Sequence, residues 1–472
     1  MASGVRVVAT TALVVLLAGG AYATADAYDV VPGIVTLAPV PAPANPFPTA
    51  PGAVPAPAVT ALLGALDTAA PAPAPAKLQG LVAALVADAR LGTGTATGVV
   101  VVDGLTGDVL ASNAPEVPHT PASTAKLVTA VAALTQLPAT TTLPTRVVKG
   151  AAGQVVLVGG GDMMLAAGAG DPTAVDGRAG LADLAAQVAK ALKLAGTTTV
   201  SLGVDDTLFS GPALSPTWAA SDIAAGYVAP VTALAVDVAK IKPGEYPPRY
   251  PDPSLAAAGQ LAARLAEQGI TVTGNPSRVT APAGATELGV VRSAPIADVV
   301  QYFLHTSDNT ITEVVARVVA VHMGLPGSFE AASKAVLRAA AALGLDTSAA
   351  TLVDASGLGA GSALPPQLLV DLVRLSTDPT HPELREVATG MPIAGLSGTL
   401  ADRFTTTAAR GLVRAKTGSL PHVTSLAGTV VDADGRLLAF AVLADQTPDG
   451  GQWAPRATID AFVTTLQACG CR

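Results

Sequence analysis

The stretch PASTAKLVTA, Pro121–Ala130, decides how the rest of this sequence is interpreted. Its composition predicts a helix over residues 120–134, with Pro121 near the start and a small, apolar interior. Ser123 and Lys126 stand three residues apart and therefore share one face of that helix. A lysine whose pKa is lowered by burial or by a nearby cation can act as a base toward a serine hydroxyl. The stretch thus predicts an activated serine at a helix N-terminus, where the helix dipole favours developing negative charge.

Two further short motifs follow in the chain, and each occurs only once, like Ser-x-x-Lys itself. Ser307-Asp308-Asn309 lies between two predicted helices, so its side chains can point into a cleft. Lys416-Thr417-Gly418 lies on a predicted strand at the start of a C-terminal hairpin, where a glycine permits close approach of another backbone. The three motifs together predict one catalytic site assembled from distant parts of the chain.

In this order the three motifs form the set found in penicillin-binding proteins and class A β-lactamases. The wider sequence resembles one group, the D-alanyl-D-alanine carboxypeptidase/endopeptidase family of class C low-molecular-mass penicillin-binding proteins, which are DacB-like serine peptidases. Besides the first stretch, the matching segments are DDTLFSGP (205–212), YVAPVTALAVD (227–237), HTSDNTITE (305–313), DASGLG (354–359), MPIAGLSGTLADRF (391–404) and GLVRAKTGSLPHVTSLAG (411–428).

The resemblance implies a role for each motif residue. Ser123 would attack the carbonyl of a D-Ala-D-Ala peptide and form an acyl-enzyme, with Lys126 as base or proton relay. Ser307 would pass a proton to the leaving amine, and Asn309 would orient Lys126 and the substrate amide. The substrate-binding residues implied are Lys416 for positive potential, Thr417 for the terminal carboxylate, Gly418 for close approach, and Ser419, whose backbone N–H completes the oxyanion hole with that of Ser123. The implied ligands are peptidoglycan stem peptides, with β-lactam antibiotics as covalent inhibitors.

The resemblance and the pattern of elements predict an α+β fold with two parts. The first is a transpeptidase-like domain of the penicillin-binding protein/β-lactamase type, an antiparallel sheet flanked by helices, formed by residues 77–146 and 292–472. The second is an inserted α+β domain, residues 147–291, because the interval between the first two motifs is short for two inserted domains. Strands are predicted at 98–103, 108–111 and, three in succession, within 411–445; helices are predicted at 78–89, 181–194, 255–268, 296–304, 312–322, 328–343, 366–375 and 458–467.

Composition narrows the partners of this 472-residue chain. Half of the residues are hydrophobic and only 13% are charged, which excludes a wholly disordered chain and a coiled coil. A net charge of −8 without any Lys/Arg-rich run argues against binding to nucleic acid. Five histidines without metal spacing and two cysteines predict no metal site and no cofactor. The pairing of Cys469 and Cys471 is left open.

The N-terminus predicts export. Arg6 precedes an uncharged apolar stretch, and Ala23-Thr24-Ala25 fits a cleavage site, so residues 1–25 form a signal peptide or an uncleaved anchor. Residues 26–76 are a Pro/Ala-rich linker. We therefore expect a protein of the extracytoplasmic cell envelope or a secreted one, which meets the membrane only through its N-terminal segment.

Several alternatives stay open on the sequence alone. Carboxypeptidase and endopeptidase activity both cleave after a D-Ala carbonyl, so the motifs do not separate them. The other hypotheses are a β-lactamase or esterase of the same fold and a non-catalytic wall-binding protein. His305 and His422 are interpreted as residues lining the cleft, Asp205-Asp206 and 354–357 as turns, and Met163-Met164 as core.

Overall fold

The computed structural model describes residues 17–28, 30–31, 67–92 and 96–470. The chain divides into two units, residues 1–65 and 66–472. In the first unit residues 17–27 are helical, while residues 1–16 and 32–66, which hold most of the predicted signal segment and linker, lie outside the described residues. Among the described residues, no helix is both long and apolar enough to cross a membrane.

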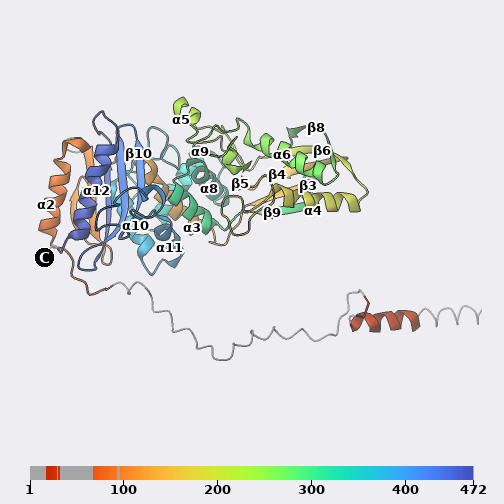
Figure 1. Cartoon of the computed structure of the whole chain (residues 1–472), viewed down its shortest axis with the longest axis horizontal. Coiled ribbons are helices and arrows are strands. Elements are labelled where there is room, and N and C mark those ends of the chain that lie inside the picture. The colour runs from red at the N-terminus through yellow and green to blue at the C-terminus, as the bar shows by residue number, and fades with distance from the viewer. Residues whose placement is uncertain (1–16, 29, 32–66, 93–95, 471–472) are drawn as a thin grey trace, which may run out of the picture. The chain divides into compact units, whose positions relative to one another are not determined.

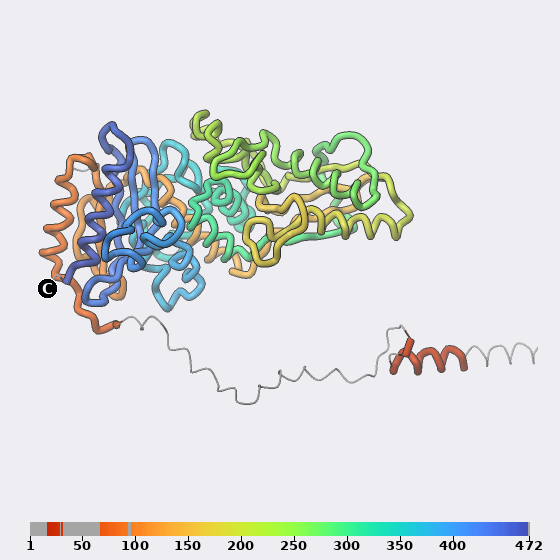
Figure 2. The backbone as a smooth tube through the Cα atoms, in the orientation of Figure 1, coloured from red at the N-terminus to blue at the C-terminus, as the bar shows by residue number. Residues whose placement is uncertain are grey.

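A five-stranded antiparallel sheet organises the second unit, with the strand order β10-β11-β12-β1-β2. Strand β1 lies between β2 and β12, so the N-terminal hairpin joins the three C-terminal strands; Figure 2 shows these orange and blue segments together. The predicted hairpin and the three successive strands are confirmed, and β10, which carries Lys416-Thr417-Gly418, is an edge strand. The bounds are β1 Thr97–Asp103, β2 Val109–Asn113, β10 Val413–Leu420, β11 Val423–Val431 and β12 Leu437–Ala444.

Helices cover both faces of this sheet. Alternate residues of β1 point to opposite sides and therefore pack against different helices. Val99 and Val101 join a core with α2 (Pro75–Val86) and α12 (Trp453–Ala468), which lie side by side in Figure 1. Val100 and Val102 join the core on the other face, with α3 (Lys126–Gln136) and α10 (Pro366–Thr377). All four valines are at most 1% exposed, so the sheet is a central layer between two helical layers.

The helices on either side of the second motif pack around α3. Their bounds are α7 Ile296–Thr306, α8 Asn309–His322, α9 Phe329–Ala342 and α11 Arg385–Gly390. Helix α8 begins three residues before the predicted start because the Asp308 side chain accepts a hydrogen bond from the backbone N of Ile311, 2.9 Å away. This cap places Asn309 in the first turn of α8.

Residues 144–292 contain a second sheet with its own core, while Met163, Phe209 and Trp218 from this range pack into the core around α3. The strand order is β8-β6-β4-β3-β9, in which β4, β6 and β8 run parallel. The first strand and the last are neighbours, so the chain enters and leaves this sheet at one place. The bounds are β3 Pro144–Lys149, β4 Gln154–Val158, β6 Thr199–Asp205, β8 Thr271–Arg278 and β9 Glu287–Arg292, with helices α4 Leu181–Leu194 and α6 Pro253–Glu267; β5 Asp162–Leu165 pairs with β7 Leu234–Val236.

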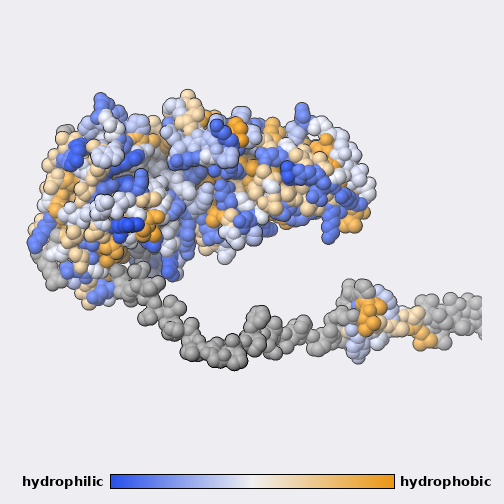
Figure 3. Space-filling model, viewed as in Figure 1, coloured by the Kyte–Doolittle hydropathy of each residue, from blue (hydrophilic) through white to orange (hydrophobic). Residues whose placement is uncertain are grey.

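The high mean hydropathy of the sequence, +0.50, has its source in these cores. On the face shown in Figure 3, hydrophilic and hydrophobic residues are interspersed. Met163 and Met164 are 0% and 2% exposed, which confirms their interpretation as core residues.

Candidate active site

Ser123 lies in a tight turn in front of α3. The single helix predicted over 120–134 is in fact a 3₁₀ turn, η3 (Ala122–Ala125), followed by α3. The first residue of this turn, Ala122, has a left-handed φ of 47°. The hydroxyl of Ser425 on β11 donates to the carbonyl of Pro121 at 2.7 Å, so the neighbouring strand holds the start of the turn. The turn therefore presents Ser123 from a fixed backbone.

Lys126 is fully buried directly behind Ser123. Its Nζ lies 2.8 Å from Ser123 Oγ, 2.6 Å from Asn309 Oδ1 and 2.9 Å from the backbone oxygen of Ser356. The amide oxygen of Asn309 and the carbonyl of Ser356 only accept hydrogen bonds, so they hold two protons of the amine. In a neutral amine the remaining position, which faces Ser123, is the lone pair.

Burial lowers the pKa of Lys126 to about 8, against the opposing charges of Asp354, Glu313 and Asp308. At pH 7 about one-tenth of the molecules then carry a neutral amine. The arrangement can therefore take the proton of Ser123 Oγ near neutral pH.

Two buried carboxyl groups fix the segment that supplies the Ser356 carbonyl. Glu313 on α8 accepts from the backbone N of Ser356 at 2.8 Å and of Ala355 at 3.0 Å. Asp354 accepts from the backbone N of Gly357 at 2.7 Å and from Trp218 Nε1 at 2.7 Å. Burial, and then the charge of Asp354, raise the pKa of Glu313.

The sequence placed residues 354–357 in a turn near the cleft, and they do form one. It missed Glu313 and the contact of Ser356 with Lys126. The only available signal was that both residues fall within segments, HTSDNTITE and DASGLG, that carry the resemblance.

Ser307 and Lys416 form a second pair. Ser307 is left-handed (φ 59°) at the end of α7, and its Oγ accepts from Lys416 Nζ at 2.9 Å. The ammonium also donates to the carbonyl of Thr417 at 2.8 Å. Burial lowers the pKa of Lys416 well below its ordinary value, and the charge of Lys126 lowers it further. Two buried lysines thus each contact a serine hydroxyl in one site.

Strand β10 meets the serine turn closely. A Cβ on Gly418 would lie 2.1 Å from Ser425 Oγ and 2.7 Å from the carbonyl oxygen of Pro121, so this glycine lets β10 pack against the turn. Beside it, the hydroxyls of Thr417 and Thr399 are 2.7 Å apart. Arg456, from the first turn of α12, donates to Ser419 Oγ at 2.7 Å; sequence reasoning gave no indication of this arginine.

All eight predicted site residues come together at one cleft of ≈1610 Å³. Lys126 and Lys416 are buried behind it, and His422 lines it while His305 is not part of its lining. Among the described residues, no cluster of His, Cys, Asp or Glu could hold a metal ion. The predicted site residues that line the cleft are Ser123, Ser307, Asn309, Thr417, Gly418 and Ser419.

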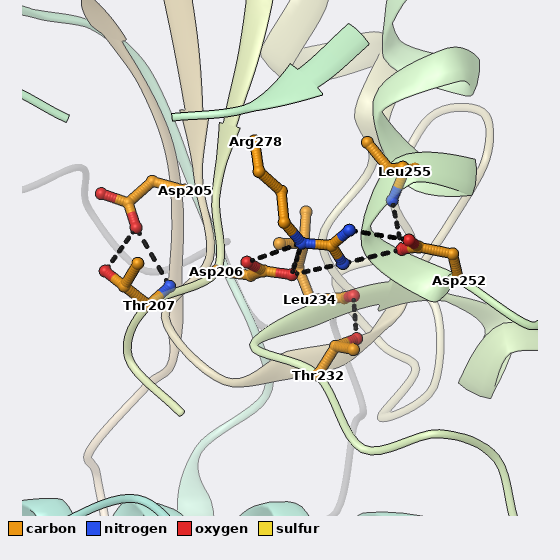
Figure 4. Close-up of polar contacts among 8 residues, drawn as sticks. All are labelled: Asp205, Asp206, Thr207, Thr232, Leu234, Asp252, Leu255 and Arg278. Carbon is orange, nitrogen blue, oxygen red and sulfur yellow. Dashed lines mark hydrogen bonds and ion pairs between the residues drawn. The ribbon is translucent and has the colours of Figure 1, made fainter. Parts of the chain in front are cut away.

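The acidic pair Asp205-Asp206, drawn in Figure 4, does not line this cleft. Asp205 accepts from the backbone N and the hydroxyl of Thr207 at 3.0 and 2.6 Å, which forms the expected turn. Asp206 forms an ion pair with Arg278, which also pairs with Asp252 in front of α6. Asp206 therefore links the end of β6 to β8 and α6 through Arg278, whereas Asp205 holds its own turn.

The sequence matches a known protein family over most of its length. The model of the D-Ala-D-Ala carboxypeptidase 3 (S13) family matches residues 78–251 and 246–468. The chain belongs to this family. It is 37% identical to carboxypeptidase DacB of Mycolicibacterium smegmatis, over 98% of this chain and 96% of the relative. It is 38% identical to a carboxypeptidase of Mycobacterium tuberculosis, over 86% of each chain.

Solved structures show the same fold. Penicillin binding protein 4 of Haemophilus influenzae matches with a TM-score of 0.65 and 21% identity, over 78% of this chain and 95% of that one. A second structure of that protein, complexed with a β-lactam, has a TM-score of 0.59. The predicted family, the predicted α+β fold of the penicillin-binding protein type and the predicted enzyme class, a serine-type D-Ala-D-Ala carboxypeptidase, are confirmed.

Proposed function

We propose that Ser123 is the nucleophile of this S13 peptidase and that Lys126 is its base. The observation that carries the proposal is the set of three contacts of Lys126, which aim the free position of a buried amine at Ser123 Oγ. Lys126 takes the hydroxyl proton as Oγ attacks the carbonyl carbon of the penultimate D-Ala. The peptide C–N bond breaks, and the acyl group stays on Ser123 as an ester until water hydrolyses it.

The remaining motif residues serve the same reaction. Ser307, held by Lys416, passes a proton to the leaving amine, and Thr417 binds the carboxylate of the leaving D-Ala. The backbone N–H groups of Ser123 and Ser419 stabilise the oxyanion, and loss of one such donor typically costs about 10²–10³ in rate. The proximity of Lys416 Nζ to Ser307 Oγ, 2.9 Å, supports the proton route.

The substrates we propose are the D-Ala-D-Ala stem peptides of peptidoglycan, their D-Ala cross-links, or both. β-Lactams would acylate the same serine, as the β-lactam complex of the Haemophilus influenzae protein suggests by analogy. The test is intact-mass spectrometry after incubation with a fluorescent penicillin. One adduct is expected on the wild-type protein and none on Ser123→Ala; a wild-type protein without an adduct contradicts the proposal.

Digestion of purified peptidoglycan fragments separates the two peptidase activities. Release of free D-Ala identifies a carboxypeptidase, whereas conversion of cross-linked dimers to monomers identifies an endopeptidase. If fragments of defined structure give neither free D-Ala nor monomers, the proposed substrate class is contradicted.

We also propose the domain organisation and location that the sequence predicts. Residues 77–146 and 292–472 form the catalytic domain and residues 147–291 an inserted domain; the separate core of the second sheet supports this division. Action on peptidoglycan requires export, which residues 1–25 would direct as a signal peptide or as an anchor. The protein would then act in the cell envelope or outside the cell and meet the membrane only through that segment.

A further inference from the structure

Residues 237–250 form a closed loop beside the cleft, and its base is strained. Asp237, Val238 and Ala239 form the turn η4 (Asp237–Ala239), with φ values of 44°, 50° and 59°. A left-handed residue other than glycine costs about 1–2 kcal/mol, and such residues persist only where the surroundings hold them. The loop is closed by hydrogen bonds from the backbone N of Tyr250 to the carbonyl of Ala239, 2.8 Å, and from Ile241 to Pro248, 3.0 Å.

Arg249 ties this strained turn to a second segment. Its Nη1 donates to the carbonyl of Val238 at 2.9 Å. Its Nε and Nη2 both donate to the carbonyl of Gly226, at 3.2 and 2.9 Å. A side chain with donors in a fixed planar fork can hold two backbone oxygens in a set geometry.

The second segment, Gly226-Tyr227, is pressed between the loop and α8. Gly226 has a φ of 76°, and a Cβ on it would lie 2.5 Å from the carbonyl oxygen of Pro247. The ring of Tyr227 packs edge to face against that of Tyr246, with centroids 5.0 Å apart. The carbonyl of Tyr227 then accepts a hydrogen bond from Asn309 Nδ2 at 2.9 Å.

This last contact decides which end of the Asn309 amide faces Lys126. The carbonyl of Tyr227 can only accept, so it holds the NH₂ end of the amide and leaves Oδ1 to accept from Lys126 Nζ at 2.6 Å. A reversed amide would set its N–H groups against the N–H groups of the lysine. Correct orientation of the amine therefore depends on the position of the Tyr227 carbonyl.

We propose that Arg249 is a positioning residue for acylation. By holding the carbonyl of Gly226, it fixes the adjoining carbonyl of Tyr227, which orients Asn309 toward Lys126. The inference rests on the proposed function, since it takes Lys126 as the base.

The first test is Arg249→Gln, with the rate constants for acylation by a fluorescent penicillin measured by rapid mixing. We expect the acylation rate constant to fall by about 10²-fold while the dissociation constant of the initial complex stays within threefold, because only orientation is lost. The matched control is Arg278→Gln. This arginine bridges Asp206 and Asp252 away from the cleft, and its variant should acylate at the wild-type rate (Figure 4).

A double-mutant cycle separates positioning from general stability. In an Asn309→Ala background, Arg249→Gln should lower acylation less than twofold further, because the group that it positions is absent. Arg249→Lys should recover part of the rate, since an ammonium can still donate to one carbonyl. It also serves as the second variant if melting curves show that Arg249→Gln is unfolded.

Two outcomes would overturn the inference. One is acylation at the wild-type rate in folded Arg249→Gln or, where that variant is unfolded, in folded Arg249→Lys. The other is an equal loss in the wild-type and Asn309→Ala backgrounds. Failure of the proposed function looks different, because the wild-type protein itself would then acquire no adduct.

Discussion

Lys126 and Lys416 are fully buried, each beside a serine hydroxyl, and neither has a carboxylate within hydrogen-bond distance among the described residues. Burial disfavours the charged form of an amine, so the pKa of each lysine is lowered and each loses its proton more readily than an exposed lysine. This property, more than the identity of the residues, distinguishes the site from a surface Ser-x-x-Lys sequence.

The pKa of Lys126 gives a pH dependence with a definite sign. In the proposed role of Lys126 as base the neutral amine is the reactive form, and the pKa of about 8 lies above neutral pH. The second-order rate constant for acylation by penicillin should therefore rise about tenfold per pH unit from pH 6 to 7 and level off above about pH 8. Stopped-flow measurements across this range test it, and a rate constant independent of pH would contradict the role of Lys126.

Lys126→Arg provides the matched control for that profile. Arginine keeps the positive charge but does not lose its proton in proteins. Acylation should fall by about 10²–10⁴-fold at every pH, while the circular dichroism spectrum stays that of the wild type.

Asp162 carries a separate prediction on stability. Its side chain is 1% exposed, and burial raises its pKa from 3.8 to about 7. Between these values the folded protein binds a proton that the unfolded chain lacks, so the free energy of unfolding falls as pH rises through this window. Asp162→Asn removes this pH dependence. The free energy of unfolding of the variant minus that of the wild type should therefore be larger at pH 8 than at pH 4, by on the order of 3–4 kcal/mol. Denaturant unfolding at both pH values tests this; an equal difference between the two proteins at both pH values would contradict it.

The motifs predicted side chains that come together at the cleft, but not the backbone groups that contact them. Ser123, Lys126 and Asn309 have characteristic side chains at characteristic spacings. The carbonyls of Ser356 and Tyr227 also contact this set, but every residue has a carbonyl, and its direction depends on the folded backbone. Arg249 and Arg456 lie in no short motif, so only the structure relates them to the cleft.

At the scale of elements, the turn η3 and the segment 354–359 depend on each other. Gly357 has a φ of 76°, and a Cβ there would lie 1.9 Å from the carbonyl oxygen of Ala122. Gly357→Ala should therefore displace the turn that carries Ser123, and we expect penicillin acylation to fall by at least about 10²-fold.

Gly344→Ala is the control for backbone strain. Gly344 has a φ of 82°, but a Cβ on it would meet nothing within 4 Å. This variant should lose about 1 kcal/mol of stability and keep the wild-type acylation rate. Equal acylation by both variants would show that the contact with Ala122 has no effect on the site.

Elements with strong periodicity were predictable, whereas some short strands were not. Helix α4 agrees with its prediction at both ends, because its apolar stripe and its glycine boundaries are clear. Strands β3 and β9 were not predicted: both are six residues long, and β9 has one buried residue. The parallel pairing of β4, β6 and β8 depends on how α4 and α6 pack, which local sequence does not specify.

At the scale of the whole molecule, residues 67–70 form hydrogen bonds with Arg436, next to the central sheet. Arg436 forms a buried ion pair with Asp103 at 2.7 Å and donates to the carbonyls of Thr68 and Ala70 at 3.2 and 3.0 Å. A chain that begins at Asp67 should keep the wild-type acylation rate, because every described residue that lines the cleft lies beyond it.

A chain that begins at residue 72 should be less stable by about 1–3 kcal/mol, since Arg436 loses two acceptors. Chemical denaturation of the two shortened chains measures the difference. Identical unfolding curves would show that these carbonyls contribute nothing.

The position of β1 between β2 and β12 determines when the central sheet can be completed during synthesis. Val99 on β1 pairs with Val442 on the neighbouring strand β12, so β1, which is synthesised early, cannot complete its pairing until β12 has been synthesised. Contacts this far apart in sequence form slowly, because a long loop has to close first. A chain still emerging from the ribosome therefore has Ser123 but no assembled site. The enzyme becomes able to cleave peptides only when β12, its last strand, has paired with β1.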